Sequence, residues 1–278
     1  MRNTQIRKHL VVCGLSVIFS FLLIIAICGA KTLIPENGTI VKTNGLLTLD
    51  YSHTDQGYVM AKGTSTDKKL KIRVTKNDET ISYDLNQEGE YEVFPLQYGS
   101  GRYTFALYKQ QSGTQYSPEG QITFHVKLEN ENIPFLYPNQ YVNFNAETPA
   151  VIKANELCEN FEDPRDIYKT IKNYIVKTFT YDYLKSYTIP KKGVLPDIND
   201  AWTKRMGICQ ALSAIAVAML RSQGVPAKLI IGTQKSERGG TLPHAWVSVI
   251  IGDKEYRFDP TAEILNTTGI TYTPERYY

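Results

Sequence analysis

The hydrophobic pattern of this 278-residue chain changes its period about halfway along the sequence. Between about residue 36 and residue 128, apolar and polar residues alternate in short runs, for example at residues 70–74, 102–108 and 121–126. Alternation of this kind is typical of strands with one buried face, and the regularly spaced turn residues favour an antiparallel sandwich. From Thr148 onward the apolar residues follow a helical period instead. The sequence therefore predicts an α+β protein in which an all-β, immunoglobulin-like sandwich precedes a mixed region.

An uncharged run from Leu10 to Ala30 follows three cations at the start of the chain. A helix of this length would extend for about 31 Å, close to the thickness of bilayer hydrocarbon. The small residues 28–30 fit a signal-peptidase site, whereas the length of the run fits an anchor. We interpret residues 1–30 as a signal peptide or membrane anchor. Cations ahead of such a run stay in the cytoplasm. We therefore expect the rest of the chain to lie outside the cytoplasm, either anchored in the cell membrane by the N-terminal segment or secreted.

Prolines and asparagines gather in residues 129–149 and indicate a junction between two domains. We expect a sandwich domain at residues 31–132 and a second domain at residues 133–278. Within the second domain, Pro149 and Pro164 each follow a residue that commonly caps helices, so each is expected to open a helix.

Charge and cysteine content exclude several classes of function. Three of the 31 basic residues lie ahead of the apolar run, so the remaining 28 balance the 28 acidic residues. A neutral body has no basic field for a polyphosphate, which argues against a nucleic-acid partner. Four cysteines are too few for a disulfide scaffold, and neither HExxH nor CxxC spacing occurs. We therefore expect no metal and no other cofactor.

The most informative segment is residues 207–226, which is rich in Ala and Leu. It predicts a buried helix that begins close to Cys209 and is capped by Gly224. A thiol at a helix N-terminus lies near unsatisfied N–H groups and the positive end of the helix dipole, which favour the thiolate. Cys209 is therefore a candidate nucleophile. A plain core cysteine, or one joined to Cys158 in a disulfide, would be inert.

A candidate base and a candidate acid lie further along the chain. Two strand-forming runs flank residues 252–253, which predicts a tight two-residue hairpin. Extended along both strands, the register of that hairpin makes His244 and Asp259 diagonal neighbours on one face. An aspartate there would fix the tautomer of His244 and stabilise its imidazolium, leaving the other ring nitrogen free to face a thiol.

The order and spacing of these residues resemble the transglutaminase-like superfamily of papain-type cysteine enzymes. Its motifs are G-x-C-x at the core helix, a G-[IV]-P-A turn, an H-A-W strand and a D-P-T strand end. They stand here at Gly207–Gln210, Gly224–Ala227, His244–Trp246 and Asp259–Thr261. The resemblance covers about residues 165–262 and implies a papain-like core, in which the helix bearing the cysteine packs on an antiparallel sheet.

The resemblance also implies a role for each site residue. Cys209 would be the nucleophile, His244 the general base and acid, Asp259 the orienting carboxylate, and Tyr181 an oxyanion-hole donor; no metal is required. The implied enzyme forms a thioester with a protein or peptide amide and completes transamidation, deamidation or hydrolysis.

Two alternatives are a cysteine protease of cell-envelope peptides and a non-catalytic surface protein. In the second, the thiol fold is a relic and the sandwich binds a partner. The substrate, the acceptor and the oligomeric state are left open by the sequence.

Overall fold

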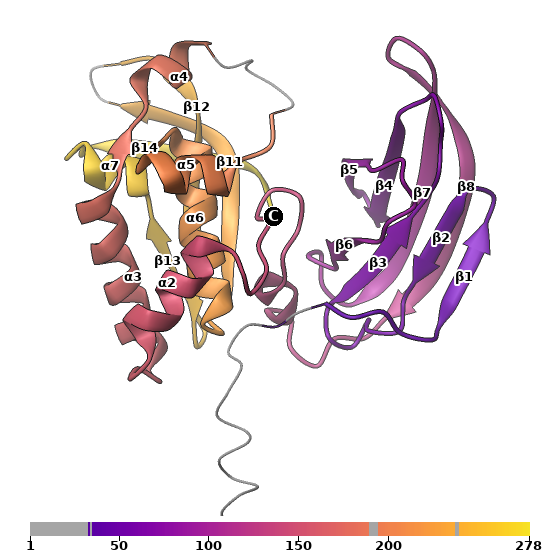
Figure 1. The fold of residues 1–278 in the computed structure, drawn as a ribbon, viewed down its shortest axis with the longest axis horizontal. Helices are drawn as coiled ribbons and strands as arrows, with labels where there is room; N and C mark the ends of the chain where they lie inside the picture. The colour runs from indigo at the N-terminus through magenta and orange to yellow at the C-terminus, as the bar shows by residue number, and fades with distance from the viewer. Residues whose placement is uncertain (1–32, 34, 189–193, 237–238) are drawn as a thin grey trace, which may run out of the picture. The chain divides into compact units, whose positions relative to one another are not determined.

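The computed structural model describes residues 33, 35–188, 194–236 and 239–278. The expected signal or anchor segment, residues 1–30, lies outside the described residues. In the part of the chain that is described, no helix is long and apolar enough to cross a membrane. Antiparallel sheets come first along the chain, and a region of helices with further sheets follows (Figure 1). The predicted mixture of α and β structure, in this order, is confirmed.

Two four-stranded antiparallel sheets form the N-terminal region, with orders β1-β2-β3-β6 and β5-β4-β7-β8. Side chains of the two sheets share a core: the rings of Phe94 (β6) and Phe105 (β7) meet edge to face at 6.2 Å. The immunoglobulin-like assignment and the boundary between residues 132 and 133 stay predictions. The strands are Val41–Asn44 (β1), Leu47–Asp50 (β2), Tyr58–Lys62 (β3), Leu70–Lys76 (β4), Glu79–Leu85 (β5), Glu92–Pro95 (β6), Gly101–Ser112 (β7) and Gln115–Val126 (β8).

One segment with the composition of a turn, residues 117–120, is part of a strand instead. β8 continues through this segment with a shift in its register against β7. Leu107 pairs with Gly120, but the next residue, Tyr108, pairs with Pro118. The shift leaves Glu119 as an extra residue, which is a β-bulge. β8 is also an edge strand, where the missing N–H of a proline is tolerated.

The C-terminal region contains most of the helices and a four-stranded antiparallel sheet of order β13-β12-β11-β14. A short parallel pair joins β9 and β10. The elements are Ile133–Leu136 (η1, a 3-10 helix), Pro149–Cys158 (α2), Pro164–Thr178 (α3), Thr180–Tyr181 (β9), Tyr183–Thr188 (α4), Ile198–Lys204 (α5), Met206–Gly207 (β10), Cys209–Ser222 (α6), Ala227–Ser236 (β11), Thr241–Ile251 (β12), Lys254–Phe258 (β13), Pro260–Ile264 (α7) and Ile270–Tyr277 (β14).

The helices at Pro149 and Pro164 begin where the sequence predicts them. At α3 the Asp163 side chain accepts a hydrogen bond from the backbone N–H of Arg165, which satisfies one of the free donors of the first turn. At α2 the Thr148 side chain does not cap the helix. Its hydroxyl lies instead in a local turn with Asn145, so proline at the first helical position is what marks the start of α2.

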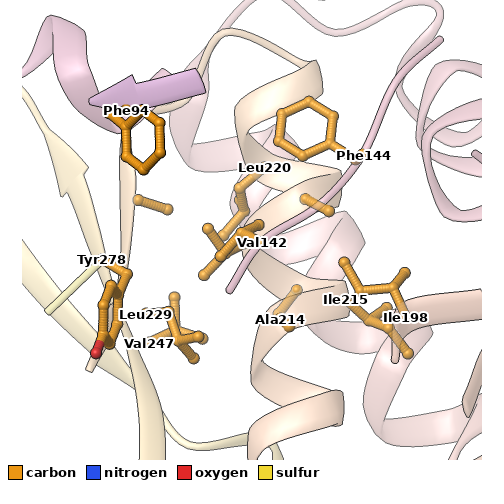
Figure 2. Close-up of a cluster of buried hydrophobic side chains, with 14 of the residues drawn as sticks. Phe94, Val142, Phe144, Ile198, Ala214, Ile215, Leu220, Leu229, Val247 and Tyr278 are labelled. Atoms are coloured by element: carbon orange, nitrogen blue, oxygen red, sulfur yellow. The ribbon is translucent and has the colours of Figure 1, made fainter. Parts of the chain in front are cut away.

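Helix α6 is the centre of the C-terminal core. From Ala211 to Ser222 every residue is buried, and the helix packs against β11 and β12 (Figure 1). Figure 2 shows Leu220 of this helix with Leu229 and Val247 of the sheet. Fully burying each such side chain contributes roughly 1.5–3 kcal/mol to the stability of the fold. The first residue of this well-held helix is Cys209, so its backbone is fixed by the core rather than by a surface loop.

The last strand, β14, pairs with β11 through an irregular register. Ile231 lies opposite Arg276 but Gly232 lies opposite Pro274, so Glu275 is an extra residue in a β-bulge. Beyond the bulge Tyr272 lies opposite Gln234. A regular ladder would have placed the next residue, Thr273, there, and side chains of successive strand residues point to opposite faces. The bulge therefore decides which face of the sheet Tyr272 occupies.

Gly232→Ala is expected to destabilise the fold, because an added Cβ would lie 2.2 Å from the backbone oxygen of Thr273. A backbone atom of a paired strand cannot move aside without breaking ladder hydrogen bonds, so we expect a loss of about 1–3 kcal/mol in the free energy of unfolding in urea. Gly240→Ala is the matched control, since its Cβ would meet no atom within 4 Å. Equal midpoints for the two variants would show that β14 is not held as closely as described.

Candidate active site

Cys209 is the first residue of α6, at the end of the helix where backbone N–H groups have no partner within the helix. Its side chain is half-buried, and its thiol is free among the described residues, so the alternative of a disulfide with Cys158 is not realised there. The chain just before it is held by β10, whose Gly207 pairs with Tyr181 of β9. The predicted helix start at the cysteine is thus present.

His244 lies on β12 and is only 5% exposed. Its Nε2 lies 2.7 Å from Oδ2 of Asp259, and the Cys209 side chain lies close enough to the ring to raise its pKa. Because Nε2 is taken by the carboxylate, Nδ1 is the nitrogen left to face the sulfur. The structure therefore brings together the three residues that the sequence singled out, in the order thiol, imidazole, carboxylate.

Asp259 is held differently from the sequence expectation. The β12–β13 ladder has the predicted register, with Ile251 opposite Lys254, but it ends at the pair formed by Val247 and Phe258. Asp259 leaves the strand and caps α7, where its Oδ1 accepts a hydrogen bond from the Ala262 N–H at 3.0 Å. The carboxylate still reaches His244, and the cap fixes its orientation from the opposite side.

His244 and Asp259 each shift the pKa of the other. Burial lowers the pKa of His244, but the hydrogen bonds and charges of Asp259 and Cys209 outweigh burial and raise that pKa to about 9. Burial raises the pKa of Asp259, yet the hydrogen bond and charge of His244, followed by the donors of Ala262 and Tyr272, hold it below its ordinary value. At neutral pH the carboxylate is therefore ionised and the imidazole carries its proton.

Tyr272 is a site residue that the sequence analysis missed. Its hydroxyl donates a hydrogen bond to Asp259 Oδ2 at 2.8 Å, the same oxygen that meets His244. Its ring centroid lies 5.0 Å from that of Trp246, which stacks on His244 at 6.2 Å. No local sequence motif identifies Tyr272 as a site residue, because its position depends on strand pairing and on the bulge at Glu275.

Tyr181, the expected oxyanion-hole donor, lies beside the nucleophile. Burial, together with the charge of Cys209, raises its pKa. Its ring meets that of Tyr183 at a centroid distance of 5.0 Å. The role in an oxyanion hole stays a prediction. Within the described ranges, no three His, Cys, Asp or Glu side chains converge as a metal site would require.

Residues 153–260 match the model of the transglutaminase-like superfamily. The chain thus carries a transglutaminase-like superfamily domain, as the motifs indicated. A relative among curated proteins is YebA of Bacillus subtilis (strain 168), an uncharacterised protein that is 24% identical over 221 residues. The match covers 73% of this chain but only 28% of YebA, so the chain spans little more than a quarter of the length of that relative.

Two solved structures are similar over most of the chain. One, named "Putative Cysteine Protease", comes from Cytophaga hutchinsonii; it is 17% identical with a TM-score of 0.41, over 84% of this chain and 82% of that one. The other is the periplasmic domain of TgpA from Pseudomonas aeruginosa, which is 14% identical with a TM-score of 0.38, over 84% and 77% of the two chains.

Proposed function

We propose that this protein is a thiol enzyme that forms a thioester between Cys209 and the acyl group of a protein or peptide amide. The observation that supports the proposal is the 2.7 Å hydrogen bond between His244 and Asp259, with the Cys209 side chain close enough to raise the pKa of the same imidazole. A relic fold would have no chemical need to keep a thiol, an imidazole and a carboxylate together, two of them buried. The site therefore favours an enzyme over a surface binding protein.

In the proposed reaction the Cys209 thiolate attacks the amide carbonyl carbon and forms a tetrahedral intermediate. In this proposal the oxyanion accepts a hydrogen bond from the backbone N–H of Cys209, which lies in the first turn of α6. The His244 imidazolium gives its proton to the amide nitrogen as the C–N bond breaks, which releases an amine or ammonia.

The second half of the reaction consumes the thioester. Neutral imidazole removes a proton from an incoming amine or from water, and that nucleophile displaces the thiolate from the acyl carbon. An amine yields transamidation, and water yields deamidation or peptide hydrolysis. We propose that this chemistry takes place outside the cytoplasm, on the evidence of the uncharged run and the cations that precede it.

The test uses the full-length chain and three probes: uptake of a fluorescent primary amine into dimethylcasein, ammonia release from a glutamine dipeptide, and cleavage of labelled casein. We expect turnover of at least one probe, and a loss of about 10³-fold or more in Cys209→Ala because the nucleophile is gone. Cys158→Ala, a change of the same kind in the core of α2, should retain turnover within about twofold.

The same preparations are labelled with iodoacetamide at pH 6 and read by intact mass and peptide mapping. Fast labelling at Cys209 alone would support an activated thiolate. Labelling of Cys209 at the rate of a model thiol, together with no turnover of any probe, would overturn the proposal and favour the surface binding protein instead.

A further inference from the structure

We propose that Tyr272 is a positioning residue that holds the Asp259 carboxylate in place for His244. The inference rests on the proposed function, because it concerns how the same site keeps the Asp259 carboxylate ionised beside His244. It assigns a task to β14, a strand that lies beyond residues 153–260, the range matched by the superfamily model.

The geometry around the carboxylate supports this assignment. Oδ2 lies 2.7 Å from His244 Nε2 and accepts from the Tyr272 hydroxyl at 2.8 Å, while Oδ1 accepts from the Ala262 N–H at 3.0 Å. A carboxylate has about four lone-pair sites, and three of them are used by donors from three different elements. Rotation of the carboxylate about its last bond would break hydrogen bonds on both oxygens, and Tyr272 adds a second hydrogen bond on Oδ2 against that motion.

Tyr272 is itself fixed by its surroundings. Its ring packs at 5.0 Å against Trp246 of β12, and the Arg257 guanidinium of β13 lies 4.3 Å above it. These ring contacts do not involve the hydroxyl, so a phenylalanine would keep them. The only hydrogen bond that the described structure gives the hydroxyl is the one to Asp259.

The charged groups around the Tyr272 hydroxyl determine the direction in which its removal changes the pKa of Asp259. Cys209, His244 and Asp259 form the site, Arg257 faces the tyrosine ring, and Glu263 of α7 lies nearby but is paired with Lys172 of α3 at 2.6 Å. The donor from Tyr272 stabilises the ionised form of Asp259. Removing that donor makes Asp259 take up a proton at higher pH, and His244 then loses its anionic partner at higher pH as well.

The test is the pH profile of Cys209 alkylation by iodoacetamide in the full-length chain, compared between wild type and Tyr272→Phe. We expect the acid limb of the profile to move upward by about half a pH unit or more, as removal of a hydrogen bond to a charged group should produce. For any probe that the wild type turns over, kcat should fall about tenfold with little change in KM.

Tyr277→Phe is the matched control, because it makes the same change on the same strand, where the ring packs against Phe135 instead of the site. Its acid limb should coincide with that of the wild type. A second variant guards against a folding defect: 3-fluorotyrosine at position 272 keeps the hydroxyl and makes it a stronger donor, so the acid limb should move downward.

The outcomes separate the two proposals. An ordinary thiol profile in the wild type would contradict the proposed function. The wild type could instead alkylate with an acid limb at low pH that neither change at Tyr272 moves. That result would leave the proposed function standing and overturn the positioning role of Tyr272. Opposite shifts in the two Tyr272 variants, with Tyr277→Phe unchanged, would establish that role.

Discussion

Replacement of His244 by alanine is expected to lower probe turnover by about 10³-fold or more, and to abolish the fast alkylation of Cys209 at pH 6. In the proposed mechanism the imidazolium stabilises the attacking thiolate and also protonates the leaving nitrogen. Without it, alkylation should rise with pH as for an ordinary thiol, whose pKa is roughly 8.5.

The pH dependence of turnover in the wild type follows from the same group. The pKa of His244 is raised to about 9, so the imidazolium persists through neutral pH and is lost as the pH rises through about 9. Turnover should therefore decline as the pH rises through about 9, as measured with a pH-insensitive probe.

His125→Ala is the control for His244→Ala, because His125 lies on β8 in the N-terminal region. Turnover in His244→Ala within tenfold of the wild type would contradict the proposed role of the imidazole.

Arg221→Met is expected to lower the free energy of unfolding by about 3 kcal/mol or more. The guanidinium is fully buried at the end of α6 and donates to three backbone carbonyls: Ala227 at 2.9 Å, Tyr137 at 2.5 Å and Tyr278 at 2.8 Å. Methionine fills similar space but removes all three donors, and each acceptor left without a partner costs about 1–3 kcal/mol. The Tyr278 oxygen keeps the backbone N–H of Leu229 as a donor. Relief from burying a cation, which lowers the pKa of Arg221 to about 9, offsets part of this loss.

The measurement is urea-induced unfolding, followed by tryptophan fluorescence and circular dichroism. Arg165→Met is the control, because the Arg165 side chain is 69% exposed and pairs only with Asp163 among the described residues, at 3.4 Å. That variant should stay within about 0.5 kcal/mol of the wild type. An Arg221→Met midpoint that matches the wild type would mean that water or local rearrangement satisfies the three carbonyls.

The parts of the site that the sequence predicted are those governed by local rules. The apolar run after Cys209 can only be a buried helix, and Gly224, with a φ of +74°, ends that helix as expected. The two-residue turn at residues 252–253 sets the strand register by itself. These rules predicted the helix start at Cys209 and the closeness of His244 to Asp259, whereas the meeting of the thiol with that pair was implied by the resemblance to the superfamily.

The parts that the sequence did not predict depend on distant pairing. β14 was not predicted as a strand, although five of its eight residues are Ile, Thr or Tyr. Even a correct strand assignment would have put Tyr272 on the wrong face, because the extra residue Glu275 reverses the alternation beyond it. That reversal depends on the close approach at Gly232, which no local pattern shows.

β14 is also the edge of its sheet, since β11 is its only paired strand in the described structure. Edge strands open more readily than interior strands, because they hold fewer hydrogen bonds and less buried surface. Were β14 to open, Asp259 would keep the donors of His244 and α7 but lose that of Tyr272. The acidity of Asp259 would then be an average over two local states, whose populations depend on the stability of an edge strand.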